Sequence, residues 1–120
     1  DFAISMAKMY EDSLLLLNVQ RLDDEANHAM IQKEKLEKQG LKHLDEAVEQ
    51  INGKVPFLQK VRFGVPSIEI AKEAKEVNAR CIVMGSRGNG PIVSAILGSV
   101  SYGVLHLAPC PVTVVPSNKI

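Results

Sequence analysis

Short apolar runs alternate along this sequence with longer stretches of helical periodicity, and this alternation limits the folds that the chain can adopt. Strands that are separated by helices pair in parallel, through right-handed crossovers that place helices on the faces of the sheet. The sequence therefore predicts an α/β fold with a single doubly wound parallel sheet and helices on both faces. The predicted strands are residues 13–19, 55–63, 81–84 and 112–115, and the predicted helices are residues 1–11, 29–50, 66–77 and 99–107.

Local signals mark the ends and faces of these elements. The pair Asn52-Gly53 is expected to stop the second helix, and Asn78 suits the left-handed residue that often follows a last helical turn. Polar residues between the apolar ones of the strand at 55–63 predict an edge or half-exposed strand. In the helix at 66–77, the predicted buried stripe is Ile70, Ala71, Ala74 and Val77, and the predicted solvent face is Lys72, Glu73, Lys75 and Glu76.

The segment from residue 81 to residue 104 contains the strongest functional signal. A buried strand ends at Gly85, a loop with Gly88 and Gly90 follows, and Gly98-Ser99 opens a helix. Glycines after a strand let backbone amides approach an anion closely, and a serine at a helix N-terminus adds a hydroxyl to the free amides there. The spacing Gly85-x2-Gly88-x9-Gly98-Ser99 therefore indicates a cradle for phosphate groups.

The glycines and the serine also have a plainer interpretation as turn and helix-cap residues, which spacing alone does not exclude. The sequence has no Gly-Lys-Ser or Gly-Lys-Thr of a P-loop. The dinucleotide-binding pattern fits poorly, because no third glycine follows Gly88 and Gly90 at the required spacing. If the segment binds phosphates, it does so by another motif.

The spacing of this segment, embedded in IVMGSRG and LGSV and followed by APCPVTVV, resembles the ATP-binding branch of the universal stress protein family. The resemblance is strongest over residues 64–115 and traceable over residues 3–19. It implies a Rossmann-like fold of the adenine nucleotide alpha hydrolase type, and a small ATP-binding protein of stress responses that forms a homodimer.

The resemblance also implies a set of nucleotide-binding residues. Positions that match Val19, Met84 and Gly85 line the adenine and ribose pocket in the family. Phosphate contacts, made largely by backbone amides, fall at the positions of Gly88, Asn89, Gly98, Ser99, Val100 and Ser101. Arg87 lies inside the loop and could neutralise phosphate charge, although a solvated loop arginine is the alternative.

The family places a central strand before the first helix, and that strand ends in an Asp-x-Ser loop whose aspartate approaches the nucleotide. Here Asp1 is followed directly by the helical pattern, and it is too close to Val19 to match that aspartate. Asp1 is therefore given no role, and we expect the central strand to be absent from these 120 residues.

The motif favours binding over efficient turnover. Hydrolysis needs a general base or another group that positions water, together with a metal anchor, and no Asp, Glu or His lies between Cys81 and Leu105. Weak ATP hydrolysis stays open, as does the identity of any accompanying Mg²⁺ or Mn²⁺. The alternatives are an interaction module with an empty pocket and a nucleotide-using enzyme.

The composition of the chain narrows the range of possible binding partners. The chain has 14 basic and 14 acidic residues and a formal net charge of +0, which argues against nucleic acid and acidic membranes as partners. No apolar run reaches membrane length. Cys81 and Cys110 are predicted to be small buried residues, with a disulfide or a reactive thiol as the alternative. We expect one domain over residues 1–120 and a cytoplasmic location.

The last strand suggests how two copies associate. Residues Val112–Val115 are all β-branched, and an exposed edge strand needs cover. Pairing of two copies across a two-fold axis would supply that cover, and the resemblance implies the same dimer. The alternative is an edge covered by the tail of its own chain.

Overall fold

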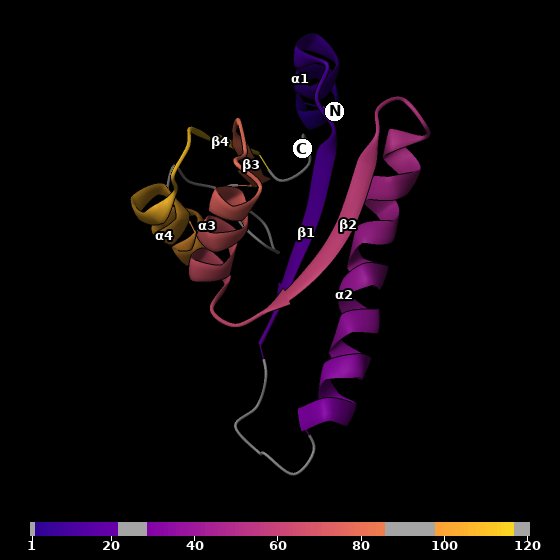
Figure 1. Ribbon diagram of the computed structural model, residues 1–120, viewed down its shortest axis with the longest axis vertical. Helices are drawn as coiled ribbons and strands as arrows, with labels where there is room; N and C mark the ends of the chain where they lie inside the picture. Colours follow the sequence, from indigo (N-terminus) through magenta and orange to yellow (C-terminus); the bar gives the residue numbers. More distant parts are fainter. Residues whose placement is uncertain (1, 22–28, 86–97, 117–120) are drawn as a thin grey trace. The chain divides into compact units, whose positions relative to one another are not determined.

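The computed structural model describes residues 2–21, 29–85 and 98–116. Along these residues helices and strands alternate in the order α1-β1-α2-β2-α3-β3-α4-β4 (Figure 1). The chain divides into two compact units. Residues Ala3–Pro66 make up the first, and Ser67–Ile120 together with Asp1–Phe2 make up the second.

In the first unit, a long helix connects two parallel strands. Helix α1 (Phe2–Tyr10) leads into β1 (Leu14–Gln20), α2 (Ala29–Ile51) follows, and β2 (Phe57–Phe63) completes the unit. Strand β1 pairs with β2 in parallel from Leu14↔Phe57 to Gln20↔Phe63. Figure 1 shows α2 running along this pair, and it contacts both strands. This is the helical crossover that parallel pairing requires.

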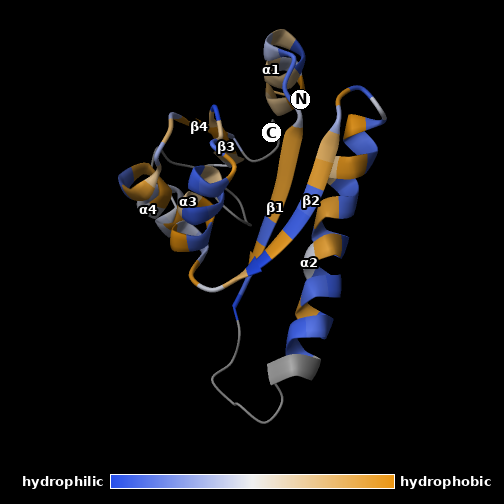
Figure 2. Cartoon of the chain, viewed as in Figure 1, coloured by the Kyte–Doolittle hydropathy of each residue, from blue (hydrophilic) through white to orange (hydrophobic). Residues whose placement is uncertain are grey.

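The core of the first unit forms where α1 and the end of α2 meet the beginnings of the strands. Ile4, Ala7, Ile51 and Val55 are buried together, with Leu14, Leu16 and Phe57 packed against them. Strand β2 is exposed over Leu58–Lys60, which confirms the half-exposed strand expected from its alternating pattern. Figure 2 shows the contrast between this mixed strand and the largely apolar β1.

A glycine in the middle of α2 allows the helix to lie close to the strands. A Cβ built on Gly40 would lie 2.8 Å from Val61 Cγ2 and 2.9 Å from Asn18 Oδ1. Both distances are too short for real atoms, so this turn of α2 packs on β1 and β2 only without a side chain. The helix then ends where expected, because Asn52 and Gly53 both adopt positive φ, 43° and 73°.

The second unit repeats the strand–helix–strand arrangement. Helix α3 (Pro66–Glu76) precedes β3 (Ile82–Gly85), and α4 (Ser99–Leu107) precedes β4 (Val112–Val115). Strands β3 and β4 pair in parallel from Ile82↔Val112 to Gly85↔Val115. Val104 of α4 is fully buried. Asn78 has a φ of 52°, which confirms the left-handed residue expected after α3.

Helix α3 corrects two expectations. Glu73 was predicted to face water, but it is only 2% exposed, whereas Val77 was predicted to be buried and is 50% exposed. Glu73 lies three residues after Ile70 and one before Ala74, so its position on the helix belongs to the buried face. The charge of Glu73 predicted exposure to solvent, but its position on the helix determines that it is buried. Val77 lies beyond the last residue of α3, where the chain leaves that face.

The described strands confirm the expected α/β class. They form two parallel pairs, β1-β2 in the first unit and β3-β4 in the second, and each pair is accompanied by helices.

Candidate functional site

The carboxyl end of β3 and the first turn of α4 are joined by one buried hydrogen bond. The Ser101 hydroxyl donates to the Gly85 carbonyl at 2.9 Å, and Ser101 is only 2% exposed. The two residues are 16 positions apart, so this bond connects both ends of the glycine-containing segment. Sequence analysis assigned Ser101 to phosphates, and no pattern of local spacing indicates this pairing with a distant carbonyl.

Within residues 2–21, 29–85 and 98–116, no side chain caps the first turn of α4. Gly98 takes the N-cap position with φ −66° and ψ 160°, no side-chain hydrogen bond caps the helix, and its first turn holds no acidic residue. The Tyr102 amide donates to the Gly98 carbonyl at 3.0 Å. The amides of Ser99, Val100 and Ser101 precede that first helical bond and point out of the helix end, where the helix dipole is positive.

These features bring part of the predicted site together. Met84 and Gly85 end β3, Gly98–Ser101 open α4, and the Ser101 hydrogen bond holds the two groups in contact. An anion beside this junction would meet backbone amides from the helix end. The arrangement suits phosphate or carboxylate groups, and it offers them no charged side chain among the described residues.

The remaining predicted site residues lie outside the described residues or in the other compact unit. Arg87, Gly88 and Asn89 lie outside the described residues. Val19 lies in β1 of the first unit, opposite Arg62 of β2. Its neighbours Asn18 and Gln20 share the other face of that strand, where Gln20 Nε2 donates to Asn18 Oδ1 at 2.7 Å.

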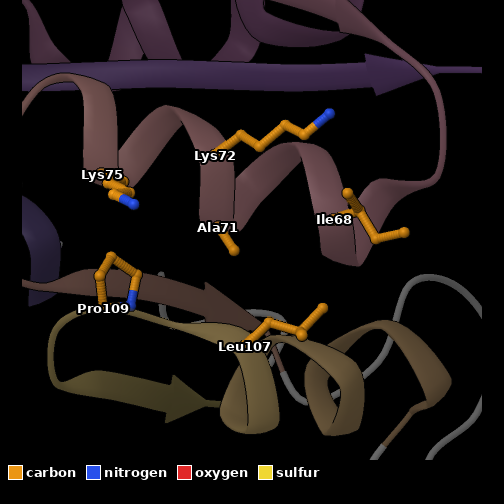
Figure 3. Close-up of a pocket in the computed structure, with 6 residues that line it drawn as sticks. All are labelled: Ile68, Ala71, Lys72, Lys75, Leu107 and Pro109. Atoms are coloured by element: carbon orange, nitrogen blue, oxygen red, sulfur yellow. The ribbon is translucent and has the colours of Figure 1, made fainter.

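A hollow of about 240 Å³ lies in the second unit. Figure 3 shows its walls, Ile68 and Ala71 on α3 on one side and Leu107 with Pro109 on the other. Lys72 and Lys75 complete the lining, and Lys72 Nζ lies 3.7 Å from Glu69 Oε2. Of the predicted nucleotide-binding residues that the structure describes, none lines this hollow.

The described residues contain neither a metal-binding cluster nor a membrane-spanning helix. Within residues 2–21, 29–85 and 98–116, no group of three or more His, Cys, Asp or Glu side chains could hold a metal ion. Over the same residues, no helix combines the length and the apolar character needed to cross a membrane.

Comparison with known proteins decides the family. The sequence model of the universal stress protein family matches residues 1–116. The chain belongs to the universal stress protein family. The resemblance stated from the motif is therefore confirmed at the level of the family.

Curated universal stress proteins align over most of the chain. One from Synechocystis sp. is 35% identical over 117 residues, which cover 92% of this chain and 71% of the relative. One from Bacillus subtilis is 38% identical over 84 residues, which cover 69% of this chain and 57% of the relative. The matched region therefore spans only part of each relative's length.

Solved structures support the fold. UspA from Lactobacillus plantarum has a TM-score of 0.74 at 22% identity, over 95% of this chain and 84% of that one. The Archaeoglobus fulgidus protein in complex with dAMP has a TM-score of 0.67 at 22% identity, over 94% and 81%. A universal stress protein in complex with cAMP has a TM-score of 0.67 at 21% identity, over 96% and 82%. These matches confirm the α/β fold with parallel strands.

Proposed function

We propose that this universal stress protein binds an adenine nucleotide, with ATP as the ligand, and acts as a stress-response regulator rather than an efficient ATPase. The observation that carries the proposal is the junction of β3 with α4, where Ser101 donates to Gly85 beside an uncapped helix N-terminus. This junction lies within the glycine and serine spacing that resembles the ATP-binding branch. The fold-related structures in complex with dAMP and cAMP support adenine nucleotides as the ligand class.

The junction also refines the role of Ser101. Its only hydroxyl proton is used by the Gly85 carbonyl, so its contribution to phosphate binding is its backbone amide. Ser99 differs, because its side chain is exposed at the same helix end and can donate to an anion. The proposed contacts are Val19, Met84 and Gly85 to adenine and ribose, with Arg87, Gly88, Asn89, Gly98, Ser99, Val100 and Ser101 to the phosphates.

The energetics require more than phosphate contacts. One charge at a helix N-terminus contributes about 0.3–1 kcal/mol, whereas micromolar affinity needs about 8 kcal/mol. The base and the ribose must therefore bury apolar surface, which is the role proposed for Val19 and Met84. AMP should consequently retain a large part of the affinity for ATP.

Turnover is proposed to be weak. General acid–base catalysis and metal-assisted transfer both need positioned side chains or a metal anchor. The described part of the junction offers only backbone groups and hydroxyls. A slow ATPase is the second candidate, and phosphate release that falls when a nearby carboxylate is replaced would favour it. An interaction module with an empty pocket is the third, and purified protein without adenine absorbance would favour it.

Calorimetric titration of ATP into Ser99→Ala tests the site. We expect its affinity to fall by an amount equivalent to about 0.5–2 kcal/mol, because one exposed donor is lost. Its unfolding free energy should change by no more than about 0.5 kcal/mol, as for most surface substitutions. Ser101→Ala is the matched variant, and it should lose about 1.5 kcal/mol of stability because the Gly85 carbonyl loses its buried donor.

Three outcomes of these experiments would contradict the proposal. Unchanged ATP affinity in Ser99→Ala would remove Ser99 from the site, and wild-type protein that binds no ATP or AMP at millimolar concentration would refute nucleotide binding as a whole. Unchanged stability in Ser101→Ala would contradict the junction itself, independently of any ligand.

We also propose a domain organisation, a cellular location, an accompanying metal ion and a dimer. We treat residues 1–120 as one universal stress protein domain, located in the cytoplasm, with Mg²⁺ or Mn²⁺ accompanying ATP. Two copies are proposed to pair through β4, Val112–Val115, because β3 covers one edge of this strand and no other described strand pairs with it. Sedimentation at increasing protein concentration measures this association.

A further inference from the structure

The two cysteines lie at the same end of the β3–β4 pair. Cys81 comes directly before β3, and Cys110 comes two residues before β4. The Ile82 amide donates to the Pro111 carbonyl at 2.9 Å, and the ladder then continues as Ile82↔Val112. This is the amino end of both strands, whereas the junction of Gly85 with Ser101 is at the carboxyl end of β3.

The register places the two cysteines on the neighbouring segments that lead into β3 and β4, offset by one residue. Extended back by one residue, the ladder sets Cys81 opposite Pro111, with Cys110 next to it along the chain. Neighbouring strands are about 4.8 Å apart and rise about 3.3 Å per residue, so the Cα atoms of such a diagonal pair are separated by roughly 6 Å. Disulfides join Cα atoms that are about 4.4–6.8 Å apart. Cys110 lies in a bend before β4, so the alternation of faces along that strand does not turn its side chain away from Cys81.

The Cys81 sulfur lies at the boundary between the two strands. Cys81 Sγ lies 3.5 Å from Thr113 Oγ1 of β4 and 3.4 Å from the Ile82 carbonyl oxygen. Burial raises the pKa of the Cys110 thiol, a negative charge on Cys81 raises it further, and a hydrogen bond with the Ile82 backbone lowers it. Both residues are partly exposed, so a small oxidant can reach them.

We propose that Cys81 and Cys110 form a dithiol site at the amino ends of β3 and β4, which hydrogen peroxide converts into an intramolecular disulfide. The proposal is independent of nucleotide binding, because neither sulfur belongs to the proposed nucleotide contacts.

The chemistry balances with peroxide as the only co-reactant. The thiolate of Cys81 attacks one peroxide oxygen, the O–O bond breaks, and a sulfenic acid forms while hydroxide takes up a proton as water. The Cys110 sulfur then attacks the sulfenic sulfur, the S–S bond forms, and the hydroxyl leaves as a second water. Two thiols and one peroxide give one disulfide and two waters, and the sulfurs supply both electrons.

The bond would close a ring that contains the whole glycine-containing segment, because residues 85–101 lie between the two cysteines. A crosslink over such a loop restricts the unfolded chain. We expect the oxidised protein to melt on the order of 10 °C above the reduced protein.

Mass spectrometry of the peroxide-treated protein tests the proposal. The chain contains two cysteines, and trypsin separates them because Arg80 and Arg87 flank the peptide that holds Cys81. We expect the intact mass to fall by two hydrogen atoms, both thiols to become inert to maleimide, and the peptide of residues 81–87 to be joined to that of residues 88–119. Cys81→Ser and Cys110→Ser should lack both the crosslink and the rise in Tm.

Three outcomes would overturn the proposal. The first is a gain of oxygen atoms on a single sulfur with both peptides still separate. The second is a disulfide that joins two chains on a non-reducing gel. The third is ring closure that is as fast in concentrated urea as in the native protein, because the fold would then contribute nothing to the pairing.

Discussion

Replacing Gly40 with valine should lower the free energy of unfolding by about 3 kcal/mol, the upper end for overpacking a tight contact. A Cβ at this position already lies 2.8 Å and 3.0 Å from the two γ-carbons of Val61, and 2.9 Å from Asn18 Oδ1. Val61 is β-branched and cannot rotate freely to give way. Asn18 Oδ1 accepts a hydrogen bond from Gln20, so its retreat would break that bond. Helix α2 must therefore shift off the strands.

Gln39→Val is the matched control, because residue 39 precedes Gly40 in the same helix and its side chain is exposed. Gln39→Val introduces the same β-branched side chain into α2 without the contact with Val61 and Asn18. It should lower the free energy of unfolding by less than about 1 kcal/mol. Chemical denaturation followed by circular dichroism measures both variants. If the two lose equal stability, helix propensity explains the effect, and the close approach of α2 to Val61 is not supported.

Gly103→Val should have a comparable effect in the second unit, also about 3 kcal/mol. A Cβ on Gly103 would lie 2.7 Å from Ser67 Cβ and 2.9 Å from Ser67 Oγ. The nearest atom is attached to the backbone of α3, so rotation of the Ser67 side chain cannot remove the clash. Helices α3 and α4 would have to separate at this point.

A double mutant isolates this contact. Ser67→Gly removes both atoms that a Cβ at residue 103 would meet, so it should restore about half of the stability that Gly103→Val loses. Leu105→Val is the surface control, because Leu105 is exposed on the same helix. Additive effects of Ser67→Gly and Gly103→Val in denaturation experiments would show that the two residues do not meet.

Local chemistry predicted much of the fold. The conformational tolerance of Asn52, Gly53 and Asn78 marked two helix ends, and all three residues have positive φ in the structure. The alternation of strands and helices predicted the parallel pairing. Glu73 was placed wrongly because its charge was given more weight than its helical phase. Which strands pair depends on residues far apart in the chain, and the sequence contains no local signal for it.

For the candidate site too, the sequence predicted the local features but not the contacts between distant residues. Spacing predicted that a strand end and a helix start would frame the candidate site, and the hydrogen bond from Ser101 to Gly85 joins those two elements. The direction of that bond was not predictable, because a serine hydroxyl can serve a ligand or a distant carbonyl and its sequence context does not distinguish them. The glycines Gly40 and Gly103 were not singled out either, since the side chains that they make room for come from other elements.

The buried Ser101 hydroxyl has a spectroscopic consequence. Ser101 is 2% exposed and the Gly85 carbonyl accepts its hydroxyl proton, so exchange of that proton with bulk water depends on opening of the protein at that point. Such a proton gives its own resonance in proton NMR spectra, whereas the protons of exposed serines are averaged with the solvent signal. The lifetime of that resonance would report how often the end of β3 separates from α4.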